Sequence, residues 1–240
     1  MKAILKHELS LYYHGMAGYV FGAFLLLFTG IGALIYNINA SVANFEYVLQ
    51  FISMVYIIIV PILTMRIIAE EKKLRTDQLL YSLPISTTEI VVGKFLSLMV
   101  VFAVPMVFIC FYPILFSRFG DVYLPTAYGS IVAFYLLGLM LMSVGMFISS
   151  LTESQGMAAG ISVAAMLFIY FMQTLLGFLP WPEAWQDKAT EIINALAPFN
   201  RFDTFVSGVF DLTAVFYYIS LTAFFLFLTV QSLDKRRYKG

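Results

Sequence analysis

The chain has 240 residues, of which 61% are hydrophobic and only 12% are charged. A soluble domain carries about a quarter charged residues, so the composition excludes a water-soluble globular protein and indicates one that lies in a lipid bilayer. The formal net charge is zero, which gives no indication of a nucleic-acid partner, and the single cysteine, Cys110, excludes an intrachain disulfide.

Six long gaps between charged residues predict six transmembrane helices. The gaps leave 37, 19, 23, 31, 29 and 22 residues without Asp, Glu, Lys or Arg, and about 20 helical residues cross a bilayer core of about 30 Å. The predicted fold is all-α integral membrane, with residues 1–240 as a single transmembrane domain. We place the spans at residues 17–36, 47–68, 91–116, 127–148, 157–179 and 212–230.

Residues 1–14 predict an amphipathic helix that lies along the membrane surface before the first span. Its apolar side chains fall within one arc of about 160°, and we expect that arc to enter the lipid boundary while Lys2 and Lys6 meet headgroups. Glu8 sits in the middle of the arc, where a bare carboxylate is costly. Either it meets a cation or donor, with basic residues of segment 66–94 as candidates, or the helix is rotated and Glu8 lies at its wet edge. With no small-residue cleavage site after the first span, we expect that span to be retained.

The segment from Arg66 to Lys94 is the most informative connection. Arg66 and Glu70 are i,i+4 neighbours, so the second span can continue beyond the membrane as a solvated helix. Thr76 is a plausible N-cap for a short helix that ends before Pro84. A capping box at residues 86–89 then opens the helix of the third span. The apolar residues 79–81 beside two polar ones favour either a surface that docks on another protein or an ordinary solvated loop.

Two further connections carry local signals. Residues 149–155 form a tight turn, where a capping box from Thr152 to Gln155 predicts the start of the fifth span. The long connection at residues 180–211 contains Trp181 and Trp185, which are typical of a membrane interface. Short helices at 183–196 and 199–210 would lie in the interface or re-enter the membrane, and the sequence leaves both open.

The distribution of basic residues predicts the orientation. Six spans put both termini on one side, and the segments on that side hold 11 of the 14 Lys and Arg residues. The opposite side holds Arg118, Lys188 and Arg201. Because basic loops stay in the cytoplasm, we expect cytoplasmic amino and carboxyl termini.

The chain shows no sequence motif for chemistry of its own. Its only Gly-Lys pair, at 93–94, precedes Phe95 and lacks the glycine-rich turn of a nucleotide-binding P-loop. No zinc-protease or nucleophile-elbow motif occurs, and the deep parts of the six spans hold no Asp, Glu, Lys, Arg or His, which disfavours a proton-driven carrier. We therefore expect no catalytic, cofactor-binding or metal-binding residue, and an energy source on another protein.

Several short motifs in the right order resemble the permease subunits of type-2 ATP-binding-cassette transporters, most closely the branch associated with bacterial gliding motility. Each is weak alone, but together they run nearly the whole length. They are Lys6-His-Glu-Leu9, Pro61-Ile-Leu-Thr-Met-Arg66, Glu70-Glu-Lys-Lys73, Thr76-Asp-Gln-Leu-Leu80, Pro84-Ile-Ser86, Glu89-Ile-Val-Val-Gly-Lys-Phe95, Ile148-Ser-Ser-Leu-Thr-Glu153 and Phe224-Phe-Leu-Phe-Leu-Thr-Val230.

The resemblance implies a set of site residues and an architecture. It implies an amino-terminal elbow helix, outer re-entrant helices in the 180–211 connection and a cytoplasmic coupling helix within residues 74–84. The residues that would dock on an ATPase are Thr76, Asp77, Gln78, Leu79, Leu80, Tyr81 and Ser82. Those at the edge of this surface would be Glu8, Glu70, Glu71, Lys72, Lys73 and Arg75. The family commonly has Gly where this chain has Arg75, which would add a charge contact to the ATPase.

The resemblance also implies the partners and the location. They are two copies of an ATPase subunit that bind ATP and Mg²⁺, a second copy of this permease or a homologous one, and an extracytoplasmic accessory subunit. The chain itself would bind no cofactor and no nucleic acid, and would be a multi-pass protein of the bacterial inner membrane, within the lipid bilayer. An ATPase-driven permease, with export as the expected direction, is thus the leading hypothesis. The alternatives are an intramembrane enzyme and a passive membrane scaffold.

Overall fold

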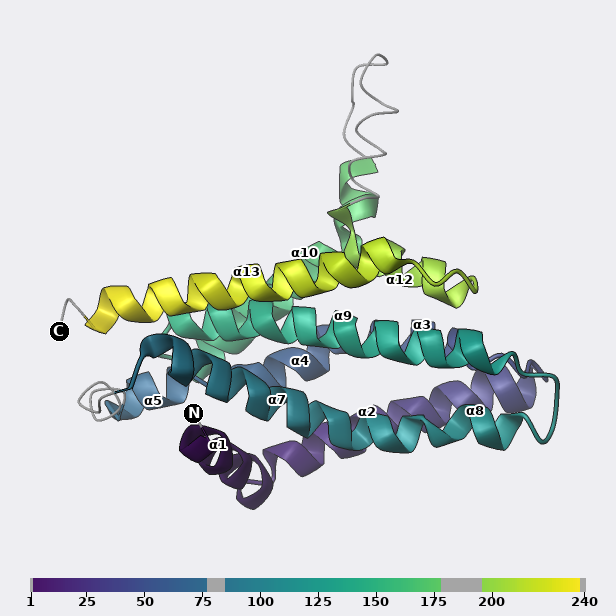
Figure 1. The fold of residues 1–240 in the computed structure, drawn as a ribbon, viewed down its shortest axis with the longest axis horizontal. Coiled ribbons are helices and arrows are strands. Elements are labelled where there is room, and N and C mark those ends of the chain that lie inside the picture. Colours follow the sequence, from purple (N-terminus) through teal and green to yellow (C-terminus); the bar gives the residue numbers. More distant parts are fainter. Residues whose placement is uncertain (1, 77–84, 178–195, 238–240) are drawn as a thin grey trace, which may run out of the picture.

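The computed structural model describes residues 2–76, 85–177 and 196–237, and every regular element in them is helical. Figure 1 shows a bundle of long helices with a short one, α1, across it near one end. The elements are α1 (Lys2–His14), α2 (Ala17–Gly32) continued by the π-helix η1 (Ala33–Asn39), α3 (Glu46–Ser53), α4 (Tyr56–Thr64), α5 (Ala69–Leu74), α7 (Thr87–Ile109), α8 (Phe111–Phe116), α9 (Leu124–Leu151), α10 (Gln155–Gly177), α12 (Pro198–Val206) and α13 (Leu212–Arg237).

Among the described residues, five helices are long and apolar enough to cross a membrane, and there are six candidate spans if one bent pair counts as a single span. The five unbent spans each overlap a predicted span. The second predicted span is not straight: α3 and the following helical stretch, 56–74, meet at an angle of 60°. The backbone tightens at this bend, since Val55 N–H donates to Ile52 O and Ile57 N–H to Met54 O, three residues back instead of four.

The bundle is built around α9. In its most apolar stretch, 78% of the residues are buried, against 17% for α10 and for α13. Two glycines let neighbouring helices approach α9 closely, as is common in membranes. A Cβ at Gly145 would lie 2.3 Å from Thr64 Oγ1 of α4, and one at Gly138 would lie 2.5 Å from a ring carbon of Phe102 in α7.

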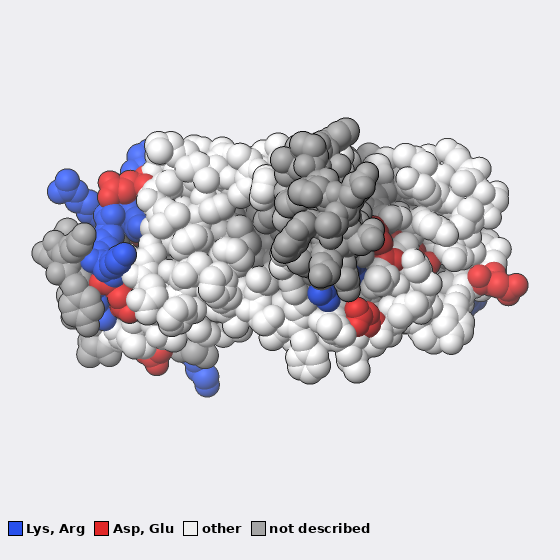
Figure 2. Space-filling model, turned by 90° about the horizontal axis from the view of Figure 1, so that it is seen from above, with Lys and Arg blue, Asp and Glu red and all other residues white. Residues whose placement is uncertain are grey.

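Charge is concentrated at one end of the molecule. Figure 2 shows Lys and Arg side chains gathered with several carboxylates at the end where α5 and the carboxyl end of α13 lie, next to a wide uncharged surface. Large apolar side chains remain exposed along the spans, for example Ile58, Val107, Phe168 and Phe216. A bilayer is the solvent that suits such a surface.

At the opposite end, α12 is held against three helices. Gln50 of α3 donates to Asp203 Oδ1 at 2.9 Å, Ser130 of α9 donates to Phe205 O, and Tyr218 of α13 donates to Pro198 O. This helix overlaps the predicted helix at 199–210: it begins one residue earlier, at Pro198, and ends at Val206. The predicted helix at 183–196 lies almost wholly outside the described residues.

Candidate functional site

The helices α1, α5 and α7 meet at the charged end. In the sequence, α5 precedes the predicted coupling segment and α7 follows it. The helix α5 leads into that segment and ends with a left-handed residue, Arg75, at φ 56°. Arg75 N–H donates to Lys72 O and Thr76 N–H to Glu71 O, the pattern of a Schellman cap. On the far side, Ser86 Oγ accepts from Glu89 N–H at 3.2 Å and starts α7, as the capping-box spacing predicts.

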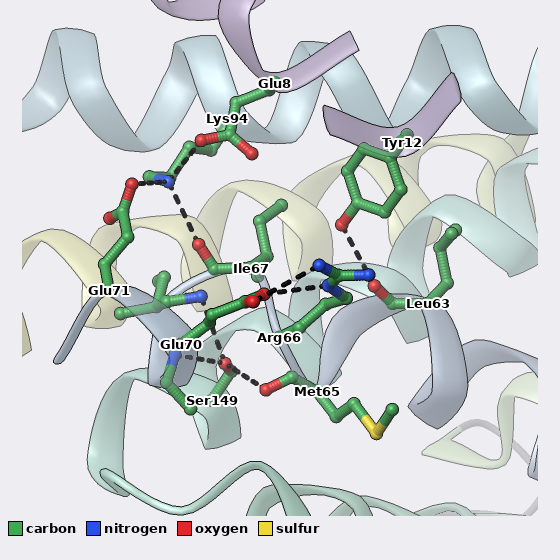
Figure 3. Close-up of polar contacts among 12 residues, drawn as sticks. Glu8, Tyr12, Leu63, Met65, Arg66, Ile67, Glu70, Glu71, Lys94 and Ser149 are labelled. Atoms are coloured by element: carbon green, nitrogen blue, oxygen red, sulfur yellow. Dashed lines mark hydrogen bonds and ion pairs between the residues drawn. The ribbon is translucent and has the colours of Figure 1, made fainter. Parts of the chain in front are cut away.

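A buried lysine connects these three helices. Lys94, near the start of α7, is only 1% exposed. Its Nζ donates to Glu8 Oε1 of α1 at 2.5 Å, to Glu71 Oε1 of α5 at 2.7 Å and to Ile67 O at 3.0 Å (Figure 3). Three ammonium protons thus meet three acceptors, which leaves the cation fully satisfied.

This contact decides between the two interpretations of Glu8. The side chain is buried, and its cation is Lys94, the last residue of the segment that supplied the candidates. The apolar arc of α1 was expected to enter lipid, and this is wrong for the face around Glu8. That face packs mainly on α7, with Tyr12 4% exposed, whereas Leu11 of the same arc is 47% exposed. A buried carboxylate is stable only beside a partner, so the helix turns Glu8 inward.

Two further contacts hold the end of the second span. Arg66 Nε lies 2.8 Å from Glu70 Oε2, the i,i+4 pair that the sequence predicts. Tyr12 of α1 donates its hydroxyl proton to Leu63 O at 3.0 Å. Burial first, and then the Glu8 carboxylate, raise the pKa of Tyr12, so this hydroxyl remains a neutral donor at physiological pH.

Serines at the end of α9 contact the same region. Ser149, fully buried, donates to Met65 O and accepts from the amides of Ile68 and Ala69. The carbonyl oxygen of its neighbour, Ser150, accepts from Lys72 Nζ of α5 and from Ser232 Oγ of α13. Five backbone or side-chain contacts therefore tie α9 to α5, to the residues just before it and to α13.

The carboxyl end of α13 contacts two connections at the charged end. Arg236 Nη1 lies 2.6 Å from Glu153 Oε1, and Arg237 Nη1 donates to Ile85 O at 3.2 Å. The hydrogen bond and charge of Arg236 lower the pKa of Glu153. The predicted capping box at Thr152 is wrong, because Thr152 is extended and ends α9, its hydroxyl donates to Ser154 O, and α10 begins only at Gln155.

A cavity of about 260 Å³ opens between α1 and α5. Its wall combines charged and polar side chains with apolar ones, among them Glu8, Arg66, Glu70, Leu74 and Thr76. Within the described residues no group of three or more His, Cys, Asp or Glu side chains could hold a metal ion.

The structure places the predicted site residues unequally. Lys94 with its two carboxylate partners, Glu8 and Glu71, is called the Lys94 cluster below. Of the predicted edge residues, Glu8, Glu71 and Lys72 are turned inward, while Lys73 and Arg75 are exposed. Of the docking residues only Thr76 is described, and its hydroxyl donates to Glu71 O at 3.4 Å. The other six, Asp77 to Ser82, lie outside the described residues.

Sequence reasoning did not single out three residues of this site. Lys94 was one of several basic residues of segment 66–94 considered as partners of Glu8, Tyr12 was only part of an apolar arc, and Ser149 was only part of a turn. Lys94 had one usable signal, namely a cation inside an apolar helix start that needs a carboxylate. Tyr12 and Ser149 had none, because their partners are backbone groups far away in the sequence.

Comparison with models of protein families finds one match over nearly the whole chain. Residues 6–232 match the family described as "ABC-2 family transporter protein". The matched range begins inside α1 and ends inside α13, so it contains the whole Lys94 cluster. No curated protein matches the chain.

Proposed function

This chain belongs to the ABC-2 family of transporter permeases, multi-pass membrane proteins without ATPase activity that work with ABC ATPase subunits, and from that premise we propose that it lines a substrate pathway opened by such a subunit. The docking surface is the predicted coupling segment, Thr76 to Ser82. Movement of that segment, driven by ATP and Mg²⁺ on the partner, would pass into the spans on either side of it.

The observation that best supports this proposal is the frame around the segment. The helix before it, α5, and the helix after it, α7, are joined through Lys94, which bonds to Glu71 and to Ile67 O. The same ammonium binds Glu8 of α1. A displacement of the segment would therefore be transmitted to three helices together. A docking surface needs such a connection if ATPase binding is to rearrange the helices that line the pathway.

We also propose the arrangement around this permease. Two ATPase copies would bind two permeases, either two copies of this chain or this chain and a homologous one, with an extracytoplasmic accessory subunit on the outer side. The chain would belong to the gliding-motility-associated branch and act in export from the bacterial inner membrane. Support for the branch comes from the ordered motifs between Lys6 and Val230.

The charged end would face the cytoplasm. It carries α5 and the basic end of α13, which hold Lys72, Lys73 and residues 235–237. Basic segments are retained on the cytoplasmic side, where an ATPase is also found. The opposite end, with α12 folded over α3 and α9, would then form the outer closure of the pathway.

Co-purification tests the proposed function. The chain, with an affinity tag at its carboxyl end, is isolated from membranes of its native host, and the retained proteins are tested for ATP hydrolysis. We expect an ABC ATPase subunit to be retained by the natural chain. Leu79→Asp should abolish that retention, because a carboxylate would replace an apolar docking contact.

The matched control is Leu124→Asp, the same substitution at the opposite end, where Leu124 is 38% exposed. It should reach the membrane and retain the ATPase. If no ATPase subunit co-purifies with the natural chain, or if Leu79→Asp retains as much of it as Leu124→Asp does, the proposed function is wrong.

A further inference from the structure

The helix that ends the second span is interrupted between α4 and α5, at residues 65–68. In a continuous α-helix the Ala69 amide would donate to the Met65 carbonyl. Here the hydroxyl of Ser149 stands between these two groups: it donates to Met65 O at 3.1 Å and accepts from Ala69 N–H at 3.1 Å and from Ile68 N–H at 3.3 Å (Figure 3). A side chain from α9 has replaced a rung of the helical ladder.

Two more backbone groups beside the interruption have side-chain partners. Leu63 O accepts from the Tyr12 hydroxyl, while Ile67 N–H, its partner in a regular helix, turns to Thr64 O at 3.3 Å. Ile67 O accepts from Lys94 Nζ. Groups from α1, α7 and α9 thus satisfy the backbone on both sides of the interruption.

The two sides of the interruption are held differently. On the α4 side, Gly145 lets Thr64 pack directly on α9, so that α4 is fixed to the most buried helix of the bundle. Gly145 and Ser149 are four residues apart and share one face of α9. On the α5 side, charged contacts predominate: Lys94 binds Glu71, and Lys72 binds Ser150 O.

These contacts point to a joint. An inserted side chain is one of the recognised causes of a break in a helix. Here it removes the bond from Ala69 N–H to Met65 O, while the bond from Glu70 N–H to Arg66 O at 3.3 Å keeps the two parts connected. We propose that α5 turns relative to α4 about residues 65–68, and that Ser149 is the positioning residue that holds the relative orientation of α4 and α5 seen in this structure. The proposed cause of this turn is an ATPase that acts on the coupling segment, and in that respect the inference rests on the proposed function.

Spin-label distances test the joint in the full-length permease in lipid nanodiscs. Cys110 is replaced by Ala, and label pairs are placed at residues 73 and 124, which span the joint, and at 62 and 124, which do not. Lys73, Ile62 and Leu124 are all exposed. Ser149→Ala should broaden the 73–124 distance distribution or add a second population, while the 62–124 distribution stays as in the natural chain.

Two variants separate positioning from general stability. Ser143→Ala removes a hydroxyl that is equally buried in α9 but bonds only to Met140 O of its own helix, so the 73–124 distribution should not change. Ser149→Thr keeps the hydroxyl and should restore the single population. An unchanged 73–124 distribution in Ser149→Ala, or equal broadening in Ser143→Ala, overturns the proposal.

A second arm tests the joint in the transport cycle. In the co-purified complex, ATP with orthovanadate should shift the 73–124 distance and leave the 62–124 distance unchanged. A shift in both pairs, or in neither, would contradict a joint at residues 65–68. The first arm needs no ATPase, so a failure of co-purification counts against the proposed function and not against the joint.

Discussion

Lys94 brings one ammonium to two carboxylates in a place where its side chain is almost completely buried. Taking ions out of water is expensive, and their attraction offsets that cost only when every charge has a partner. Glu8 and Glu71 depend on the same cation, so its loss would leave two carboxylates without their ammonium. The cluster therefore contributes geometry more than net stability: it fixes where α1 and α5 lie against α7.

Lys94→Met tests this dependence. We expect it to destabilise the purified permease by about 3–5 kcal/mol, the usual effect of removing one partner from a buried ion pair, measured as a lower unfolding temperature in detergent. Adding Glu8→Gln and Glu71→Gln should recover part of the loss. Lys73→Met, an exposed lysine on α5, is the control. If the two lysine variants unfold at the same temperature, the cluster does not hold the helices.

Arg75 occupies a backbone conformation that favours glycine. It is exposed and has φ 56° at the carboxyl end of α5, where glycine adopts the left-handed region without strain. Arg75→Gly should therefore stabilise the fold by about 1 kcal/mol, measured as a higher unfolding temperature. Arg75→Ala removes the same side chain without relieving the backbone, and it should give no gain. A gain in both variants would mean that the charge, and not the backbone, is responsible.

At the scale of elements, the packing of α4 on α9 depends on residues that have almost no side chain. Gly145 faces Thr64, and Gly138 faces Phe102 and Tyr56. Without a hydrophobic driving force between helices in lipid, close approach of backbones is a main source of helix association. The interruption at residues 65–68 begins one residue after this close contact.

Gly145→Ala should separate α4 from α9. Its Cβ would lie 2.3 Å from Thr64 Oγ1, so we expect a loss of about 1–3 kcal/mol from overpacking, again read from thermal unfolding. Gly160→Ala in α10 meets nothing within 4 Å and should be neutral or stabilising. Adding Thr64→Ala to Gly145→Ala should recover stability. Equal tolerance of the two glycine substitutions would show that the helices are not in tight contact.

At the scale of the molecule, the concentration of charge at one end gives an orientation that labelling can test. In a Cys110→Ala background, a cysteine at position 119, where Phe119 is 89% exposed between α8 and α9, should react with a membrane-impermeant maleimide added to intact cells. A cysteine at position 235, in the basic end of α13, should react only after the membrane is opened. The reverse pattern would place the termini outside.

The sequence by itself determined the spans and the class of protein. Gaps between charges, capping signals such as Ser86, and the i,i+4 pair of Arg66 and Glu70 are local, and local rules of helix formation apply to them with or without tertiary contacts. The same reliance on local signals explains why the sequence does not predict the bend between α3 and α4. The two residues at the bend, Met54 and Val55, are neither proline nor glycine.

Only the tertiary structure decided how the charged end is joined. Glu8 and Lys94 lie 86 residues apart, and Ser149 meets the Ala69 amide from 80 residues away. The sequence shows that Glu8 needs a partner, because a buried carboxylate is costly, but it cannot choose among the cations that could supply one. Backbone groups freed by the interruption at residues 65–68 leave no mark in the sequence, since every residue other than proline has the same amide and carbonyl. Their partners depend on which helices pack together, and that is fixed by the shape of the whole bundle.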